Sequence, residues 1–338
     1  MSITDPQPVA NDGQEGKEDL AADVEKLVQN LADVKSGIAQ VIYGQTEVID
    51  EVLITLLAGG HALLIGVPGL AKTRLVETLG TVLGLAEKRV QFTPDLMPAD
   101  IIGSEVLEES DTGKRSFRFI EGPVFCQLLM ADEINRASPR TQSALLQAMQ
   151  ERTVSVAGTR HPLPEPFHVL ATQNPLELEG TYPLPEAQLD RFLMEVDIDY
   201  PNRDAEREML VVTTGSAEEK PAQILDGEEL LAAQRLVRRI PVGESVVEAI
   251  LSLVRSGRPA ESDTATEIAW GPGPRASQAL MLAVRARALL DGRFAPSIDD
   301  VVTLAGPVLR HRMALNFAAR ADGVTLDEVI DRLCAPLA

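Results

Sequence analysis

One eight-residue segment constrains the fold of this chain more than any other: Gly66-Val67-Pro68-Gly69-Leu70-Ala71-Lys72-Thr73. It follows the apolar run 61–67 (HALLIGV), which indicates a buried strand, and it opens a helical pattern over 72–83. A glycine-rich loop between a strand and a helix gathers backbone N–H groups at a helix N-terminus, where they bind an anion. The segment therefore predicts a phosphate-binding loop in an α/β fold.

Two side chains of the loop fit the same chemistry. Lys72 would neutralise the β- and γ-phosphates of a nucleotide, and Thr73 would offer its hydroxyl to Mg²⁺. Ala71 departs from the pattern G-x-x-x-x-G-K-[ST], because it replaces the last glycine. Its methyl group is tolerated if the residue takes right-handed helical dihedrals, which alanine adopts easily. The alternative to a phosphate site is an ordinary strand–turn–helix with a capping loop.

Apolar runs alternate with helical patterns through the first 200 residues. Helices are expected at 20–41, 45–58, 72–83 and 140–150. Strands are expected at 61–67, 89–93, 125–131, 167–172 and 194–198. Strands that alternate with helices predict a parallel sheet covered by helices on both faces.

Two segments interrupt this alternation. Residues 105–124 alternate around Asp111-Thr112-Gly113, and residues 153–166 place Gly158-Thr159 at a turn, so both indicate hairpins. After about Asn202 strand signals vanish. Helical patterns then cover 228–239, 244–255, 275–290, 298–311 and 326–333. The stiff loop 271–274 (GPGP) delivers Arg275 to a helix start.

These patterns divide the chain into three parts. Residues 1–20 are expected to be an acidic, mobile tail, since the first 25 residues hold seven acids and one lysine. Residues 21–205 would form an αβα nucleotide-binding core. Residues 206–338 would form a small helical domain.

An acidic pair ends one of the predicted strands. Asp132-Glu133 follows the apolar run 126–131, about 60 residues after the phosphate loop. In such a site Asp132 would hold Mg²⁺ through water, and Glu133 would orient and polarise the attacking water. Taken alone, the pair could equally cap a helix. Asn174 ends a further strand and could fix the water or touch the γ-phosphate, although a turn-forming Asn before Pro175 is the alternative.

Composition narrows the class of partner. The chain has 51 acidic and 31 basic residues, a formal net charge of −20, so broad surfaces for nucleic acid or anionic membranes are not expected. No apolar run approaches 18 residues, and the start lacks a basic and then apolar leader. Cys126 and Cys334 lie far apart, and the four histidines are isolated, so neither a disulfide scaffold nor a histidine metal site is expected. The sequence predicts a cytoplasmic protein.

The motifs GVPGLAKT, LLMADEINRASPRTQSALLQAMQE, ATQNPLELEGTYPLPEAQLDRF and GPGPRA together resemble the MoxR family of AAA+ ATPases. The resemblance covers about residues 25–335. Alanine at the position of Ala71 is common in that family, so this departure strengthens the resemblance. The resemblance implies an AAA+ αβα nucleotide-binding domain followed by a small all-α lid. It also identifies the two predicted hairpins with the helix-2 insert and the hairpin before sensor 1.

The resemblance also implies roles for individual residues. Lys72 and Thr73 would be the Walker A pair, Asp132 and Glu133 the Walker B pair, and Asn174 the sensor-1 residue. Arg191 looks like the arginine finger, and Arg275 like the sensor-2 arginine. The adenine would lie against Val41, Ile42, Tyr43 and Gly44. The cofactors would be ATP and Mg²⁺.

The arginines have a physical logic of their own. A positioned guanidinium stabilises the charge on the transferring phosphoryl group by roughly 10³ to 10⁵ in rate. Arg191 lies in a short segment that begins a strand, so it would not easily reach its own phosphate loop, and a neighbouring subunit in a ring would receive it. A salt bridge of Arg191 with Asp190 or Glu186, and a solvated helix-start role for Arg275, are the alternatives. Arg136 and Arg140 are expected to be subunit contacts or surface charges.

The leading hypothesis is a Mg²⁺-dependent ATPase that works as a ring, expected to be a hexamer. Family resemblance implies a chaperone that assists maturation, assembly or cofactor insertion of protein complexes, with a von Willebrand factor type A domain protein as a candidate client. A DNA-dependent motor of the same clade is one rival, although the first hairpin shows no positive funnel. An ATP-gated scaffold that does not hydrolyse ATP is the other.

Overall fold

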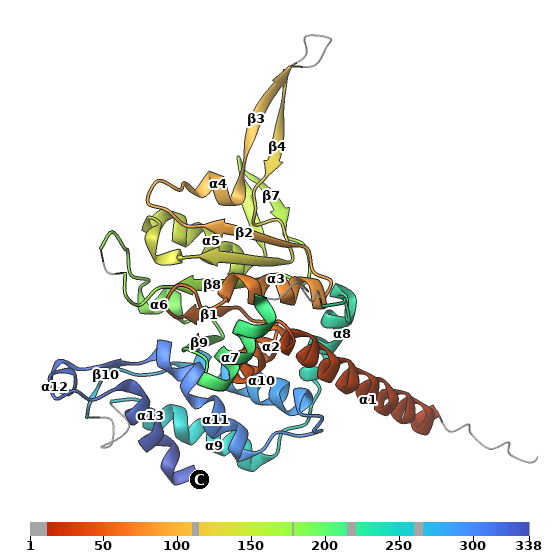
Figure 1. Ribbon diagram of the computed structural model, residues 1–338, viewed down its shortest axis with the longest axis vertical. Coiled ribbons are helices and arrows are strands. Elements are labelled where there is room, and N and C mark those ends of the chain that lie inside the picture. The colour runs from red at the N-terminus through yellow and green to blue at the C-terminus, as the bar shows by residue number, and fades with distance from the viewer. Residues whose placement is uncertain (1–11, 110–114, 178, 215–220, 260–265, 338) are drawn as a thin grey trace, which may run out of the picture.

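The computed structural model describes residues 12–109, 115–177, 179–214, 221–259 and 266–337, with side chains from Glu25 onward. Its centre is a five-stranded parallel sheet in the order β2-β5-β8-β1-β9 (Figure 1). The strands are β1 (Ala62–Ile65), β2 (Glu87–Gln91), β5 (Leu128–Asp132), β8 (His168–Gln173) and β9 (Met194–Asp197). All five were predicted within a few residues. The inner strands β1, β5 and β8 are mainly apolar and almost fully buried, whereas the edge strands β2 and β9 carry polar, exposed residues.

Helices cover both faces of the sheet. On β1, Leu64 packs into a large apolar cluster with helices α1 (Asp12–Ala39), α2 (Thr46–Leu57) and α3 (Lys72–Val82). The preceding residue, Leu63, points to the opposite face of the sheet and packs into a second apolar cluster with α5 (Pro139–Glu151). The remaining short elements of this half are α4 (Pro98–Ile102), η1 (Ile134–Arg136), α6 (Glu186–Leu189) and α7 (Arg203–Thr213). The core is thus the three-layer α/β arrangement that the alternation predicts.

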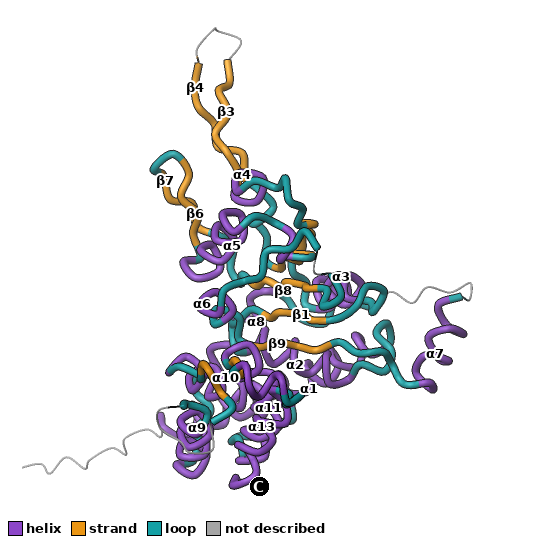
Figure 2. The backbone as a smooth tube through the Cα atoms, turned by 90° about the vertical axis from the view of Figure 1, so that its left-hand side faces the viewer, coloured by secondary structure: helices purple, strands orange, loops and turns teal. Residues whose placement is uncertain are grey.

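Both predicted hairpins are present. Strands β3 (Gly103–Glu109) and β4 (Arg115–Glu121) form the longer one, which projects away from the sheet (Figure 1). Its predicted turn at 111–113 lies outside the described residues. Strands β6 (Thr153–Val156) and β7 (Thr159–Pro162) form the shorter one, on the same side of the molecule (Figure 2). Its turn is Ala157-Gly158, one residue before the predicted place, because Val156 pairs with Thr159.

The lid is helical, as expected. Its helices are α8 (Gly227–Val237), α9 (Glu244–Ser256), α10 (Pro274–Leu290), α11 (Ile298–Leu309), α12 (Phe317–Ala321) and α13 (Leu326–Cys334), with η3 (Arg310–Arg312) and η4 (Ala335–Leu337). The prediction that no strand follows about Asn202 is wrong at one place. Strands β10 (Ile268–Trp270) and β11 (Ala314–Leu315) pair antiparallel, and two or three residues are too short for a periodic signal.

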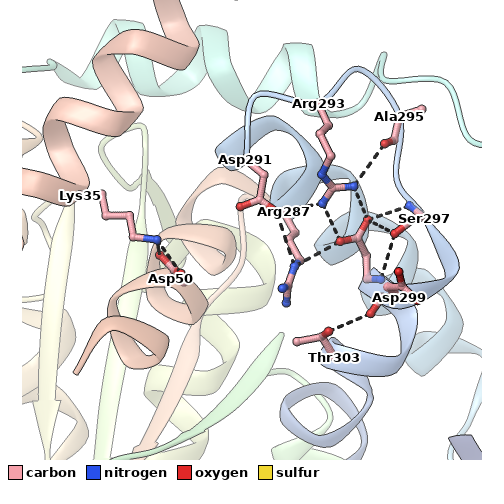
Figure 3. A network of polar contacts seen from close by, with 10 residues as sticks. Lys35, Asp50, Arg287, Asp291, Arg293, Ala295, Ser297, Asp299 and Thr303 are labelled. Atoms are coloured by element: carbon pink, nitrogen blue, oxygen red, sulfur yellow. Dashed lines mark hydrogen bonds and ion pairs between the residues drawn. The ribbon is translucent and has the colours of Figure 1, made fainter. Parts of the chain in front are cut away.

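A buried carboxylate holds the loop between α10 and α11. Asp300 accepts from both terminal nitrogens of Arg293, at 2.8 and 2.6 Å, and from the backbone N–H of Ser297 at 2.7 Å. Figure 3 shows Arg287, Arg293 and Ser297 in this network of polar contacts. Arg287 approaches the same carboxylate at 3.2 Å. Asp300 is only 3 % exposed, so these partners offset the cost of burying its charge.

The first helix begins earlier than expected. The apolar stripe predicts a helix from Leu20, but α1 begins at Asp12, so residues 12–20 of the predicted tail are helical. Residues 1–11 of that tail lie outside the described residues. From Leu31 the stripe is buried as expected, through Val34 and Ile38.

Candidate active site

The phosphate loop lies between the carboxyl end of β1 and the start of α3. Gly69 and Ala71 both have left-handed backbones, with φ values of 89° and 57°. The right-handed dihedrals considered for Ala71 are therefore wrong, and this alanine holds a conformation that favours glycine by about 1 kcal/mol. Strained backbone of this kind is concentrated at functional sites.

Lys72 is folded back onto the loop that precedes it. Its Nζ donates to the carbonyl oxygens of Gly66 and, at 3.1 Å, of Val67. Burial lowers the pKa of Lys72 from its usual value, and the nearby Asp132 and Glu133 carboxylates act against this shift. An ammonium held by two carbonyls lies where the loop would bind an anion.

The acidic pair ends β5 and begins η1. Asp132 is the last residue of the strand, and Glu133 follows it with a left-handed backbone, φ 54° and ψ 52°. Thr172 of the neighbouring strand β8 joins the two residues. Its hydroxyl donates to Oδ1 of Asp132 at 2.6 Å and accepts the backbone N–H of Glu133 at 2.9 Å. The strand register that puts β5 beside β8 creates this link.

Further side chains from other elements hold the two carboxylates. Arg89 of β2 forms a close ion pair with Asp132. Gln91 donates to Oε2 of Glu133 at 2.8 Å, and Arg136 donates to the same oxygen at 3.1 Å. Arg136 was expected to be a surface or subunit-contact charge; its side chain is 40% exposed and also contacts Glu133. Arg89, Gln91 and Thr172 were not predicted as site residues, although Arg89 and Gln91 alternate on one predicted strand and so share a face.

Asn174 follows β8 at the same edge of the sheet. Its Oδ1 accepts the backbone N–H of Leu176 at 3.1 Å, which is the turn-forming contact considered as an alternative. The residue is nevertheless 7 % exposed and lines the phosphate cavity. Asn174 can thus form the turn and still face the phosphate cavity, so the two interpretations do not exclude each other.

A cavity of about 440 Å³ brings these groups together. The residues that line it come from the phosphate loop and from the carboxyl ends of three strands: Pro68, Gly69, Leu70, Ala71, Lys72, Thr73, Arg74, Arg89, Gln91, Asp132, Glu133, Thr172 and Asn174. A hydroxyl (Thr73) and a carboxylate (Asp132) in one cavity are oxygen ligands of the kind that Mg²⁺ takes alongside nucleotide phosphates and water. Within the described residues no group of three or more His, Cys, Asp or Glu is placed to hold a metal ion.

Arg191 and Arg275 lie on the side of the sheet where the parallel strands begin, opposite the side where they end and the phosphate loop lies. The phosphate loop follows Ile65, which pairs with Asp197 at the carboxyl end of β9, whereas Arg191 precedes the amino end of β9. Four residues of strand, about 13 Å, separate the two edges. Arg191 and Arg275 instead line a separate cavity of about 280 Å³, together with Asp190, Arg238 and Arg312.

Asp190 is the ion-pair partner of two arginines in this second cavity. It contacts Arg275 at 3.7 Å and Arg312 at 2.7 Å. Arg275 was alternatively expected to be a solvated arginine at a helix start. Its side chain is indeed half exposed, but it also forms an ion pair with Asp190.

The predicted adenine segment does not line the phosphate cavity. Val41 and Ile42 are buried in the apolar core, and Tyr43 is half-buried. Gly44 has a φ of 69°, and a Cβ there would lie 2.4 Å from the Cβ of Ala205, so glycine is needed for this turn. Gly44 lines a third cavity of about 540 Å³, between the core and the lid.

The third cavity is acidic. Glu47, Glu51, Asp197, Asp199 and Asp327 line it around Arg310, which contacts Asp197 at 2.5 Å and Asp327 at 2.8 Å. Burial raises the pKa of Glu51 to about 7, with Arg310 acting against the shift. Burial likewise raises the pKa of the neighbouring Glu195 to about 7.

Comparison with known proteins gives two domain matches. Residues 61–194 match the model of the "ATPase family associated with various cellular activities (AAA)", and residues 260–333 match the AAA lid domain. The described residues contain no helix that is long and apolar enough to cross a membrane.

Several relatives match over most of their length. The chain is 42% identical to Chaperone MoxR1 of Mycobacterium tuberculosis, over 96% of this chain and 85% of the relative. It is 34% identical to Protein MoxR of Paracoccus denitrificans, over 84% and 88%. The crystal structure of a protein from Cytophaga hutchinsonii superposes with a TM-score of 0.87 at 36% identity, over 96% of this chain and 98% of that one.

Proposed function

Because the chain belongs to the MoxR family of AAA+ ATPases, we propose that it hydrolyses ATP to ADP and phosphate in the cavity beside the phosphate loop. The observation that carries this proposal is the meeting of Lys72, Thr73, Asp132, Glu133 and Asn174 in one cavity. These residues come from three different strand ends, yet each is the residue type that phosphoryl transfer from ATP requires.

Each side chain has a task in the proposed reaction. The backbone N–H groups of residues 69–73 and the Lys72 ammonium bind the phosphates. Thr73 and Asp132 would hold Mg²⁺, which neutralises charge on the β- and γ-phosphates. Glu133 accepts a proton from the attacking water, and Asn174 orients that water or the γ-phosphate. Gln91 and Arg136 aim the Glu133 carboxylate, since both donate to its Oε2.

We further propose that Arg191 and Arg275 act on the nucleotide of a neighbouring chain. Both lie about one strand length from their own phosphate loop, at the amino edge of the sheet. A guanidinium is needed where charge develops on the γ-phosphate. A ring, which we take to be hexameric, would bring this edge of one chain to the carboxyl edge of the next.

The proposed work is the remodelling of protein partners in the cytoplasm. One relative is named a chaperone, and a von Willebrand factor type A domain protein is our candidate client. The charges of the β3–β4 hairpin support a protein client over DNA, because Arg115 pairs with Glu109 and Arg118 with Glu108. Immobilised Glu133→Gln protein with ATP should retain such a client and release it with ADP; equal retention in both states would count against the proposal.

Two variants test the reaction and the shared site. Glu133→Gln should reduce ATP turnover to background while ATP still binds, because the base is lost and the phosphate loop is intact. Arg191→Ala should also lose turnover. Mixing the two should restore it, since an Arg191→Ala chain keeps its own base and receives Arg191 from a Glu133→Gln neighbour. An Arg191→Ala ring that hydrolyses ATP at the wild-type rate would refute the shared site.

A further inference from the structure

The side chain of Arg312 is buried at the amino edge of the sheet, with all five of its N–H donors directed at acceptors. Nε donates to Oδ1 of Asp190 at 2.7 Å. Nη1 donates to the carbonyls of Leu193, at 3.1 Å, and Val308, at 2.5 Å. Nη2 donates to the carbonyls of Phe192, at 2.6 Å, and Asp190, at 3.4 Å. A fully used guanidinium fixes its acceptors more rigidly than a single bond does.

The acceptors of Arg312 lie on both sides of Arg191. The carbonyls of Asp190, Phe192 and Leu193 flank the Arg191 backbone in the segment between α6 and β9. His311 adds a donor from Nε2 to the Phe192 carbonyl at 3.1 Å. Arg312 and His311 belong to η3 of the lid, so the lid determines the path of the core segment that carries Arg191.

Asp190 extends the same arrangement to Arg275. One of its carboxylate oxygens accepts from Arg312, and the other lies 3.7 Å from Nη1 of Arg275. Arg275 stands at the start of α10, whose first residue is Pro274. The Asp190 carboxylate thus links Arg312 to Arg275, while the carbonyls of Asp190, Phe192 and Leu193 link Arg312 to the segment that carries Arg191.

We propose that Arg312 is a positioning residue for the ATPase reaction. It holds Arg191 through the backbone carbonyls of Asp190, Phe192 and Leu193, and Arg275 through the Asp190 carboxylate, in the orientation presented to the nucleotide of the neighbouring chain. This inference rests on the proposed function. Because Arg312 is on the lid and Arg191 is on the core, a lid that shifts relative to the core withdraws both arginines together.

The substitution Arg312→Lys tests the proposal, since lysine keeps the charge and loses the planar fork. We expect kcat for ATP to fall at least tenfold while the KM for ATP stays within about twofold, because misplacing a reacting group lowers the rate steeply and the phosphate loop at the other edge is untouched. Asp190→Asn is the second variant, in case Arg312→Lys does not fold. Asparagine is nearly isosteric with aspartate, so this variant should fold. It should lower kcat and leave the KM for ATP nearly unchanged.

Arg293→Lys is the matched control for a general loss of lid stability. Arg293 also binds a buried carboxylate of the lid, that of Asp300, but its hydrogen bonds and ion pairs go to Asp291, Ala295 and Asp300, not to Arg191 or Asp190. It should lower the melting temperature and leave kcat near the wild-type value. If Arg293→Lys and Arg312→Lys lower kcat equally at an equal loss of melting temperature, Arg312 has no positioning role.

Mixing with Glu133→Gln chains separates the two proposals. An Arg312→Lys chain should regain turnover in mixed rings, because its Glu133→Gln neighbour supplies a correctly held Arg191. If Arg191→Ala recovers on mixing and Arg312→Lys does not, the positioning role is wrong and the proposed function stands. If neither recovers, the shared site itself fails and the positioning role fails with it.

Discussion

Thr172 donates its hydroxyl proton to Asp132 at 2.6 Å and thereby ties the end of β8 to the acidic pair of β5. The same oxygen accepts the Glu133 N–H, so a single hydroxyl supports both the proposed metal ligand and the proposed base. The left-handed backbone of Glu133 is stabilised by this contact. A residue that orients a metal ligand commonly matters nearly as much as the ligand itself.

Thr172→Val should therefore lower ATP turnover by about 10- to 100-fold. Valine has the same shape but leaves Asp132 and the Glu133 N–H without this partner. Steady-state ATPase assays over a range of Mg²⁺ concentrations measure the effect. Thr172→Ser keeps the hydroxyl and should retain most of the activity. Equal losses in both variants would assign the effect to packing rather than to the hydroxyl.

Ala71 offers a test of the loop backbone. Ala71→Gly should keep ATP binding and leave the free energy of unfolding within about 1 kcal/mol of wild type, because relief at φ 57° is offset by greater freedom of the unfolded chain. Ala71→Val should destabilise the protein by about 2 kcal/mol, since a β-branched residue strongly disfavours this region. Urea unfolding and nucleotide titration measure both quantities. A valine variant as stable as the glycine variant would contradict the left-handed conformation.

Glu51 predicts a pH dependence of stability. Its carboxyl has a pKa of about 7 in the folded protein and 4.5 as its usual value, so between these values the folded state binds more protons than the unfolded state. The free energy of unfolding should therefore fall as pH rises from about 4.5 to about 7. Glu51→Gln should remove this part of the dependence and stabilise the protein by about 2 kcal/mol at pH 8.

Urea unfolding between pH 5 and 8 measures this change. Glu47→Gln is the control, because Glu47 lines the same cavity but is exposed. It should keep the fall in stability with rising pH. Parallel pH profiles for wild type and Glu51→Gln would show that Glu51 does not titrate in this range.

Asp300 predicts a lid that is sensitive to the loss of one charge. Burial acts to raise the pKa of Asp300, but hydrogen bonds from Arg293 and Ser297 outweigh it and lower that pKa below its usual value. The stabilisation is thus present at neutral pH and is lost as pH falls through the lowered pKa. Asp300→Asn should cost about 3 kcal/mol at pH 7, since it leaves Arg293 without its buried partner.

The neighbouring Asp299 is the matched control for Asp300. It is exposed in the first turn of the same helix, so Asp299→Asn should cost less than about 1 kcal/mol. Chemical unfolding at pH 7 compares the two. Similar losses would assign the effect to the helix N-terminus instead of the buried ion pair.

Local pattern predicts much of this fold because the signals are short and repeated. The inner strands β1, β5 and β8 are mainly apolar and buried, and the carboxyl ends of parallel strands lie on one side of the sheet, so Lys72, Asp132 and Asn174 could be expected to lie together. Strand order is a different matter. The contact of Arg89 with Asp132 depends on β2 pairing beside β5, with Gln91 opposite Asp132, and no local pattern encodes that pairing.

The contacts around Arg191 are also beyond local pattern. Arg312 lies more than 100 residues from Asp190 and meets it only because η3 packs against the segment before β9. The right-handed dihedrals predicted for Ala71 are wrong because residue type sets only a preference for a backbone conformation, and the loop overrides that preference. The domain limits at 20 and 205 remain predictions.

In a parallel sheet the side where the strands end differs chemically from the side where they begin. Here the first side carries the phosphate loop and the proposed base Glu133, and the second carries Arg191. A contact between unlike edges is head-to-tail, so it always leaves one free edge of each kind until the assembly closes on itself. In the proposed shared site, a defect in Arg191 would be expressed one chain away from the chain that carries it. In a mixed ring each Arg191→Ala chain would therefore silence the site of one neighbour while its own site stays active, so the number of lost sites would equal the number of variant chains.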